Sequence, residues 1–138
     1  MIRPGSSFPV FIVLHLGEAK KFYEDHFSFN VAFENDWYLH LCTETGIQVG
    51  FLSPNQPTQP EMFHKTYDGS GVILSLEVED VESAYSEAKE KKLDIVLDLR
   101  SEEWGQYHFC VRDPNGVILD VVQEIEPTEE YKEGYATE

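Results

Sequence analysis

The sequence predicts an α+β protein in which a strand–helix–three-strand unit, βαβββ, occurs twice within one domain of 138 residues. The first observation is the order of apolar patterns, which runs strand, helix and three strands and then restarts. The second is an internal alignment: an offset of 65 residues pairs Leu16 with Val81, and an offset of 70 pairs Gly46 with Gly116. The third is the proline- and glycine-rich segment 53–71, which is typical of a linker between two modules.

Module one covers residues 8–52. Residues 8–14 are almost all apolar or β-branched and indicate a buried strand. The next apolar residues have the spacing of one helix face, and they are Ala19, Phe22, Tyr23, His26 and Phe27. A tight turn at 44–46 separates the last two of three further expected strands, which cover residues 31–33, 37–43 and 47–52.

Module two covers residues 72–123 and begins with an expected strand at 72–78. Asp80 is the predicted N-cap of a helix whose apolar face carries Val81, Ala84, Tyr85 and Ala88. Strands are expected at 95–99, 107–112 and 117–123, with extra residues in the loop 101–106 and a turn at 113–116. The tail 124–138 is rich in glutamate, and we expect it to be flexible.

The charge balance excludes some classes of partner. Asp and Glu number 26 against 10 Lys and Arg, so the formal net charge is −16. Phosphate neutralisation and docking on anionic lipids both need clustered basic residues, so we expect no nucleic-acid and no membrane partner. Residues 1–9 do not resemble a signal peptide, and Cys42 and Cys110 form no CxxC motif. We therefore expect a cytoplasmic protein with reduced cysteines.

Three motifs carry a resemblance to a known family. They are Phe22-Tyr23 in the first helix, Asp-Pro-Asn-Gly-Val-Ile-Leu-Asp at 113–120, and Trp-Gly-Gln-Tyr-His-Phe at 104–109. Over residues 8–123 the chain resembles the vicinal oxygen chelate superfamily, which includes glyoxalase I, bleomycin-resistance proteins, fosfomycin-resistance enzymes and extradiol dioxygenases. Segment 104–109 is most similar to the bleomycin-resistance branch. The resemblance implies that each module forms a curled mixed sheet, that the two sheets enclose a cleft, and that the protein is a homodimer.

The resemblance also implies four metal-ligand positions, which fall here on Phe8, Gly50, Ile73 and Asp120. Only Asp120 has a donor atom, whereas a catalytic divalent ion is usually held by three or more protein ligands. We therefore expect no metal and no other cofactor. This departure disfavours lyase, transferase and dioxygenase chemistry together, so we lean against an enzyme and assign no catalytic residue.

An alternative places a metal on displaced ligands. Because side chains alternate along a strand, His108 and Cys110 share the face of Asp120, and His40 and Glu77 take related places. A metal-dependent lyase or dioxygenase would then use His40, Glu77, His108 and Asp120, unless hydrogen bonds simply satisfy the histidines. Each cysteine lies two residues from a histidine, about 6–7 Å along a strand. This separation is long for a proton relay and disfavours a nucleophilic cysteine.

The aromatic residues favour a binding protein. Aromatic rings that line an apolar cleft, together with acidic groups, suit planar or cationic ligands, although the same rings could simply belong to the core. The favoured function is a metal-free protein that sequesters a drug or metabolite without turnover, and a module without any ligand remains a further alternative. The expected ligand-binding residues are Phe8, Trp37, Tyr38, His40, Glu77, Trp104, His108 and Asp120.

Overall fold

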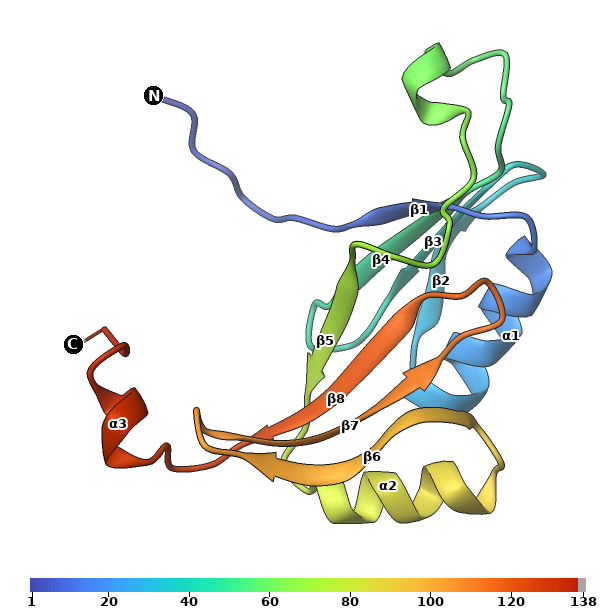
Figure 1. Cartoon of the computed structure of the whole chain (residues 1–138). Helices are drawn as coiled ribbons and strands as arrows, with labels where there is room; N and C mark the ends of the chain where they lie inside the picture. The colour runs from blue at the N-terminus through green and yellow to red at the C-terminus, as the bar shows by residue number, and fades with distance from the viewer. Residues whose placement is uncertain (137–138) are drawn as a thin grey trace. The chain divides into compact units, whose positions relative to one another are not determined.

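The computed structural model describes residues 1–136, which divide into two compact units. The first unit contains residues 1–70 together with the turn residues 114–116. The second begins at Gly71 and contains the rest of the described chain. Each unit holds one four-stranded sheet (Figure 1), and the strand and helix order confirms an α+β fold of two βαβββ modules.

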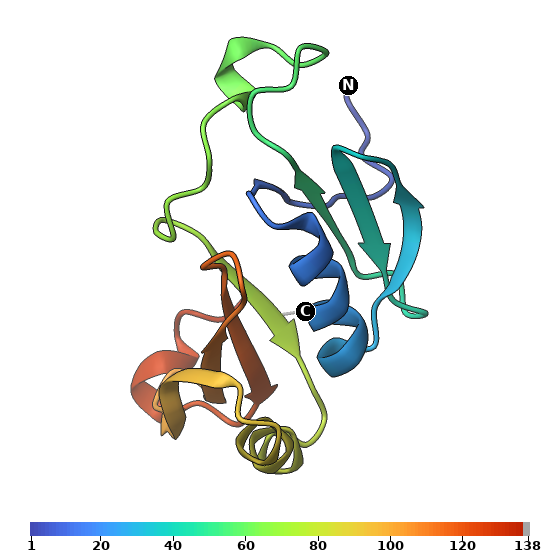
Figure 2. The same ribbon diagram turned by 90° about the vertical axis from the view of Figure 1, so that its right-hand side faces the viewer.

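The first unit has the strand order β1-β4-β3-β2. Strand β1 runs parallel to β4, and the other two pairs are antiparallel, so the sheet is mixed. Helix α1 lies along one face of this sheet (Figure 2). The linker contains a short 3₁₀ helix, η1. The bounds are β1 Val10–Ile12, α1 Leu16–Phe27, β2 Asn30–Glu34, β3 Tyr38–Cys42, β4 Gln48–Leu52 and η1 Glu61–Phe63.

The second unit repeats this arrangement with the strand order β5-β8-β7-β6. Strand β5 runs parallel to β8, and the remaining pairs are antiparallel. Helix α2 packs on β6, β7 and β8. The bounds are β5 Ile73–Glu77, α2 Val81–Glu90, β6 Asp94–Glu102, β7 Gln106–Arg112, β8 Ile118–Glu124 and α3 Glu129–Lys132.

Strand alternation separates a core face from an open face in each sheet. In the first unit, Leu39, Leu41 and Phe51 are buried, and the Phe51 ring lies 5.3 Å from the ring of Tyr23 on α1. In the second unit, the Phe109 ring lies 5.2 Å from that of Tyr85 on α2. Side chains one position away along each strand therefore point to the opposite, open face. Five of the expected ligand-binding residues lie on these faces, namely Tyr38, His40, Glu77, His108 and Asp120, and the other three, Phe8, Trp37 and Trp104, lie outside the strands.

Two local sequence signals act as predicted. The side chain of Asp80 accepts a hydrogen bond from the Ser83 backbone N–H at 3.1 Å, which confirms the N-cap of α2. In the turn between β7 and β8, the Asp113 side chain accepts from the Val117 N–H at 2.9 Å. Gly116 in this turn has φ of +86°, a conformation that favours glycine.

One strand is longer than predicted: β6 continues to Glu102, although its sequence signal stops at residue 99. The described part of the tail, residues 124–136, contains α3, and residues 137–138 lie outside the described residues. Ile125 donates its N–H to the Gly105 carbonyl at the tip of the β6–β7 hairpin, at 2.9 Å. Gly105 permits this approach because an added Cβ would lie 2.9 Å from the Ile125 oxygen. Among the described residues, the helices are too short or too polar to cross a membrane.

Candidate functional site

An apolar cavity of about 470 Å³ opens on the exposed face of the first sheet. Strands β1, β2, β3 and β4 contribute to its wall, and the linker with η1 completes it. Phe33 and Phe63 leave about half of their surface exposed at this site, at 54% and 43%. The lining residues are Val10, Ile12, Phe33, Asn35, Trp37, Tyr38, Leu52, Gln59 and Phe63.

The turn between β2 and β3 orients the aromatic wall of this cavity. The Asn35 side-chain oxygen accepts hydrogen bonds from the backbone N–H groups of Trp37, at 2.9 Å, and Tyr38, at 2.8 Å. The short polar side chain thus closes the turn in the way that asparagine commonly does. As a consequence, the backbone of Trp37 and Tyr38 is held at the start of β3, beside the cavity.

A hydrogen-bonded row continues from the cavity along β3. The Tyr38 hydroxyl lies 2.9 Å from His40 Nδ1, and His40 Nε2 lies 2.7 Å from the Gln48 side-chain oxygen. Phe8 packs edge-on against the His40 ring, at 4.5 Å between centroids. Gly50 on β4 makes room for this row, since a Cβ there would overlap the Tyr38 hydroxyl. Of the eight expected ligand-binding residues, four therefore lie together in the first unit.

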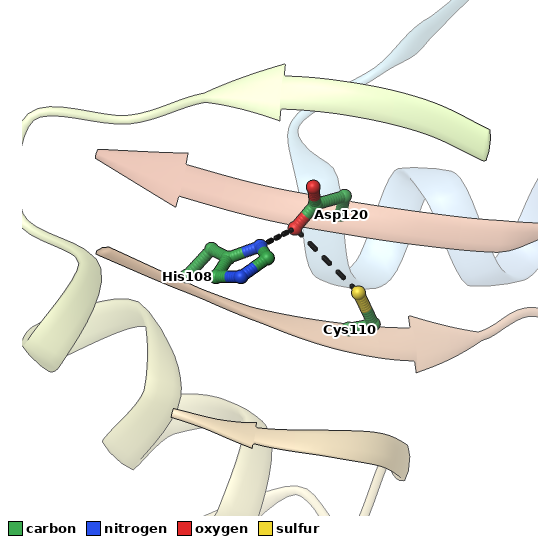
Figure 3. Close-up of side chains that lie close together, drawn as sticks. All are labelled: His108, Cys110 and Asp120. Atoms are coloured by element: carbon green, nitrogen blue, oxygen red, sulfur yellow. Dashed lines mark hydrogen bonds and ion pairs between the residues drawn. The ribbon is translucent and has the colours of Figure 1, made fainter. Parts of the chain in front are cut away.

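The second sheet carries a buried polar cluster in the corresponding region. His108 and Cys110 come from β7 and Asp120 from β8, and their side chains point toward one another (Figure 3). His108 Nδ1 lies 2.7 Å from Asp120 Oδ1, and the Cys110 thiol donates to the same oxygen at 3.5 Å. On the other side of the ring, His108 Nε2 lies 2.8 Å from Glu102 Oε2. The three residues drawn in Figure 3 are buried, and each leaves at most 9% of its surface exposed.

The charges of this cluster favour a protonated imidazole. Both ring nitrogens of His108 face carboxylate oxygens, so both must carry a hydrogen if both contacts are hydrogen bonds. Burial lowers the pKa of His108, but the hydrogen bonds and charges of Glu102 and Asp120 outweigh it and raise the pKa overall. Hydrogen bonds from His108 and Arg100 lower the pKa of Glu102. The cluster is therefore an ion-paired chain in the absence of other ligands.

Cys110 is a poor nucleophile in this environment. Burial, together with the charge of Asp120, raises the pKa of its thiol to about 12. A nucleophilic cysteine instead needs a lowered pKa and a base that takes its proton. The geometry thus agrees with the expectation that cysteine-based catalysis is disfavoured.

The other two expected residues of the second unit lie in different surroundings. Glu77 on β5 interacts with Glu124, and the hydrogen bond and like charge of that neighbour raise the pKa of Glu77. Trp104, 40% exposed, donates its indole N–H to the Gln106 side chain and packs against Tyr131 of α3. Of this unit's expected residues, the structure joins only His108 and Asp120 within the described chain.

Several residues of both sites were missed by the sequence analysis. Glu102 fell in an expected loop, because the alternation of exposed and half-buried residues in β6 breaks after Arg100. Phe63 fell in the linker, where the pair Met62-Phe63 is the one apolar signal in η1 that could have drawn attention to it. Phe33, Asn35 and Gln59 gave no signal beyond their residue types, because a cavity depends on how strands and loops meet.

The metal positions implied by the family resemblance do not fit a metal ion. Phe8 and Ile73 offer no donor atom, and Ile73 is 64% exposed. Gly50 has no side chain, and the space beside it is taken by Tyr38. Asp120 alone of the four offers a ligand atom, and a single protein ligand does not hold a catalytic divalent ion. We therefore derive no reaction step from a metal at these four positions.

Comparison with known proteins identifies the class and the family. Two successive βαβββ units, each with one mixed four-stranded sheet, are the architecture of the vicinal oxygen chelate superfamily. The chain belongs to the Glyoxalase/Bleomycin resistance protein/Dioxygenase superfamily, whose sequence profile matches residues 8–121. No curated protein matches the sequence.

Solved structures support the same fold. A superfamily member from Sphaerobacter thermophilus is 21% identical, with a TM-score of 0.71 and coverage of 90% of this chain and 100% of the other. A virulence protein from Salmonella typhimurium is 19% identical, with a TM-score of 0.73 and coverage of 91% and 100%. A lactoylglutathione lyase from Agrobacterium tumefaciens is 16% identical, with a TM-score of 0.68 and coverage of 87% and 94%. At these identities the likeness establishes the fold alone.

Proposed function

We propose that the protein binds a small planar molecule in the apolar cavity of the first unit, without turnover and without a metal at that cavity. The observation that carries this proposal is the cavity itself. Its volume of about 470 Å³ lies in the range of small-molecule sites, and aromatic side chains form much of its wall. A bound molecule would remove the exposed surfaces of Phe33 and Phe63 from water, which is favourable at roughly 25 cal/mol per Å².

The polar groups of the cavity favour a neutral ligand over a charged one. The described lining residues include two amides, Asn35 and Gln59, and none of them is acidic, basic or a cysteine or histidine. A lining of this kind offers neither a metal ligand nor a counter-charge. The sequence favoured planar or cationic ligands. This lining disfavours the cationic ones, because a buried charge without a partner is costly.

The two amides give the cavity a hydrogen-bonding pattern. The Asn35 oxygen is used by the turn, and within residues 1–136 its side-chain N–H₂ has no partner. Gln59 uses its backbone groups to bond Gln56 and His64, which leaves its side-chain amide for a ligand. The ligand class is therefore a flat aromatic ring system that carries a carbonyl or amide acceptor.

A matched set of probes tests this class. Calorimetry and thermal shift are measured with 1-naphthamide, with the anion 1-naphthoate and with the cation 1-naphthylmethylammonium. We expect binding and stabilisation by 1-naphthamide and weaker or no effects from the two ions. Equal binding of all three probes, or of none, would overturn the proposal.

An isosteric variant locates the probe. Asn35→Asp keeps the oxygen that closes the turn but removes the N–H₂ donor and adds a negative charge beside the cavity. We expect at least a tenfold loss of 1-naphthamide affinity, since a lost hydrogen bond beside a new charge costs about 1.4 kcal/mol or more. Asn30→Asp, the same change at an exposed position on β2, is the control and should leave the affinity unchanged. Unchanged binding by Asn35→Asp contradicts the assigned site.

A second function has one specific observation in its favour. The buried group His108, Cys110 and Asp120 contains metal-binding side chains, which supports a metal-dependent lyase or dioxygenase with displaced ligands. That function also assigns ligand roles to His40 and Glu77. Of these, His40 is bonded to Tyr38 and Gln48, and Glu77 interacts with Glu124. The cavity therefore supports the binding function better, and the homodimer and the cytoplasmic location stay predictions.

A further inference from the structure

We propose that His108, Cys110 and Asp120 form a binding site for a borderline-soft divalent transition metal such as Zn²⁺ or Co²⁺. Asp120 is one of the four positions that the family resemblance implies, but His108 and Cys110 are not, so two of the three ligands lie outside that set. The inference goes beyond the proposed binding function, since the apolar cavity uses none of these residues, and it names the ligand set on which the second, metal-dependent function would rest. Strands β7 and β8 set the three side chains on one face, with Cys110 directly opposite Asp120 in the register.

The distances suit an ion with three protein ligands. One nitrogen, the sulfur and one carboxylate oxygen all lie within 4.8 Å of one another. Around a tetrahedral Zn²⁺, with bonds of about 2.0–2.3 Å, such atoms lie roughly 3.3–3.7 Å apart. The Cys110–Asp120 separation of 3.5 Å already has this value, and the His108–Asp120 separation of 2.7 Å must widen. Rotation of the Asp120 carboxylate would widen this separation, and rotation of the other two side chains would adjust the distance between the His108 nitrogen and the Cys110 sulfur, which lie within 4.8 Å of each other.

The types of ligand select the metal. A thiolate and an imidazole favour Zn²⁺, Co²⁺ and similar ions over Mg²⁺ or Ca²⁺, which require oxygen ligands. Three protein ligands leave a fourth position for water, as in open zinc sites. The burial of all three residues also separates this group from the exposed acidic clusters that are common on a chain with net charge −16.

Glu102 supplies the outer contact that metal-bound histidines usually have. Its carboxylate accepts the Nε2–H of His108 at 2.8 Å, which fixes the ring and leaves Nδ1 toward Cys110 and Asp120. Arg100 in turn holds the same oxygen of Glu102 at 2.8 Å. A carboxylate behind a ligating imidazole orients the ring and strengthens the ligand. Glu102 is therefore a positioning residue of the proposed site.

Metal binding replaces protons at two atoms. The metal-free cluster holds one hydrogen between His108 Nδ1 and Asp120 and another on the Cys110 sulfur. When M²⁺ binds, these two protons pass to solvent, and the imidazole, thiolate and carboxylate become its ligands. The Nε2 proton stays between His108 and Glu102. Charge and atoms balance, and no oxidant or reductant is needed.

The first unit contains an internal control. His40 and Cys42 on β3 have the same spacing as His108 and Cys110 on β7. In the register, however, Cys42 lies opposite Gln48, whereas Cys110 lies opposite Asp120, so the third side chain of the first unit is an amide, which is already bonded to His40. The first unit thus has the histidine–cysteine pair without the third ligand, and we expect it to bind no metal.

Cobalt spectroscopy on the chelator-treated full-length protein tests the site. Addition of Co²⁺ under anaerobic conditions should produce a thiolate-to-cobalt charge-transfer band and tetrahedral d–d bands that saturate at one ion per chain. Cys110→Ser should abolish the charge-transfer band, and the matched control Cys42→Ser should retain it. Glu102→Gln should keep the band but weaken Co²⁺ affinity by about 10–100-fold, as outer-contact variants typically do.

The opposite results are equally clear. Absence of a charge-transfer band at millimolar Co²⁺, its survival in Cys110→Ser, or its loss in Cys42→Ser would overturn the proposal. If Cys110→Ser does not fold, the imidazole ¹⁵N spectrum of the wild-type protein during Zn²⁺ addition replaces it. One histidine of five should then change, at Nδ1, and a change at His40 or at several histidines would count against the site. Asn35→Asp should leave the cobalt spectrum unchanged, which separates this test from that of the cavity.

Discussion

The two sheets have the same strand order and differ in the chemistry of their open faces. The first presents an aromatic cavity and a row of hydrogen bonds through Tyr38, His40 and Gln48. The second presents a buried chain of charged groups through Glu102, His108 and Asp120. The same backbone therefore carries two chemically different groups of side chains, because the register fixes positions while the sequence sets the chemistry.

One pair of positions accounts for much of the difference. An offset of 70 residues relates Gly50 on β4 to Asp120 on β8, and each lies opposite a polar residue of the neighbouring strand, His40 or Cys110. The glycine leaves space that the Tyr38 ring fills. At the related position, the Asp120 carboxylate is hydrogen-bonded to His108 and Cys110. The comparison predicts that changes at these two positions destabilise the protein for opposite reasons.

Removal of the charge in the second sheet should have the largest effect. Asp120→Ala leaves the buried His108 with one carboxylate partner in place of two, and the Cys110 thiol loses its acceptor. Breaking a buried ion pair costs about 3–5 kcal/mol. We expect a loss near the lower value, because His108 keeps its hydrogen bond to Glu102. We expect the free energy of unfolding in chelator-containing buffer at pH 7 to fall by about 3 kcal/mol, measured by urea denaturation.

The control for this variant is Asp98→Ala, which removes a carboxylate that accepts an exposed hydrogen bond from the Tyr85 hydroxyl at 2.9 Å. Exposed hydrogen bonds contribute little, so the loss should stay near or below 1 kcal/mol. Equal losses for the two variants would mean that the charged chain of the second sheet contributes no more than a surface contact.

Most of the fold could be predicted from the sequence, because its signals are local. The helix face of α1, the Asp80 cap and the turn at 113–116 each depend on residues a few positions apart. The alternation of the strands gave the open faces correctly. The differences lie where a distant contact decides the structure: β6 runs on to Glu102 because it pairs with β7, and Ile125 reaches the tip of the β6–β7 hairpin because Gly105 leaves room for it.

The sites were less predictable for the same reason. The alternation of side chains along two strands joined by one turn was enough to predict that His108, Cys110 and Asp120 share a face. The partner that completes the charged chain, Glu102, depends on the length of β6. The cavity depends on where η1 carries Phe63, a contact between the linker and the sheet that no periodicity encodes.

Addition of one methyl group to the first sheet should have the next largest effect. In Gly50→Ala, the new Cβ overlaps the Tyr38 hydroxyl and comes within 3.1 Å of a methyl carbon of Val10. Overpacking of this kind costs about 1–3 kcal/mol, and displacement of Tyr38 should also weaken 1-naphthamide binding. Denaturation and calorimetry measure the two effects.

Two further variants show whether the clash is the cause. Gly17→Ala, at a helical position with no described heavy atom within 4 Å of the added Cβ, should be neutral or stabilising by up to about 1 kcal/mol. Tyr38→Phe should recover part of the loss when combined with Gly50→Ala, because the overlapping oxygen is gone. Full additivity in this double variant would show that Gly50 does not act through Tyr38.

The smallest expected effect concerns the like charges of Glu77 and Glu124 at the edge of the second sheet. Glu124 raises the pKa of Glu77, so the folded protein binds this proton more tightly than the unfolded chain does. The stabilisation from the protonated pair is therefore complete below the ordinary glutamate pKa and is lost as the pH rises through the raised pKa. Glu77→Gln should raise the urea midpoint slightly at pH 7 and leave it nearly unchanged in acid.

The control is Glu44→Gln in an exposed turn, because the loss of any carboxylate reduces charge repulsion in a chain with net charge −16. An equal gain for Glu44→Gln would assign the effect to net charge, and a gain from Glu77→Gln that persists in acid would rule out repulsion between the two glutamates.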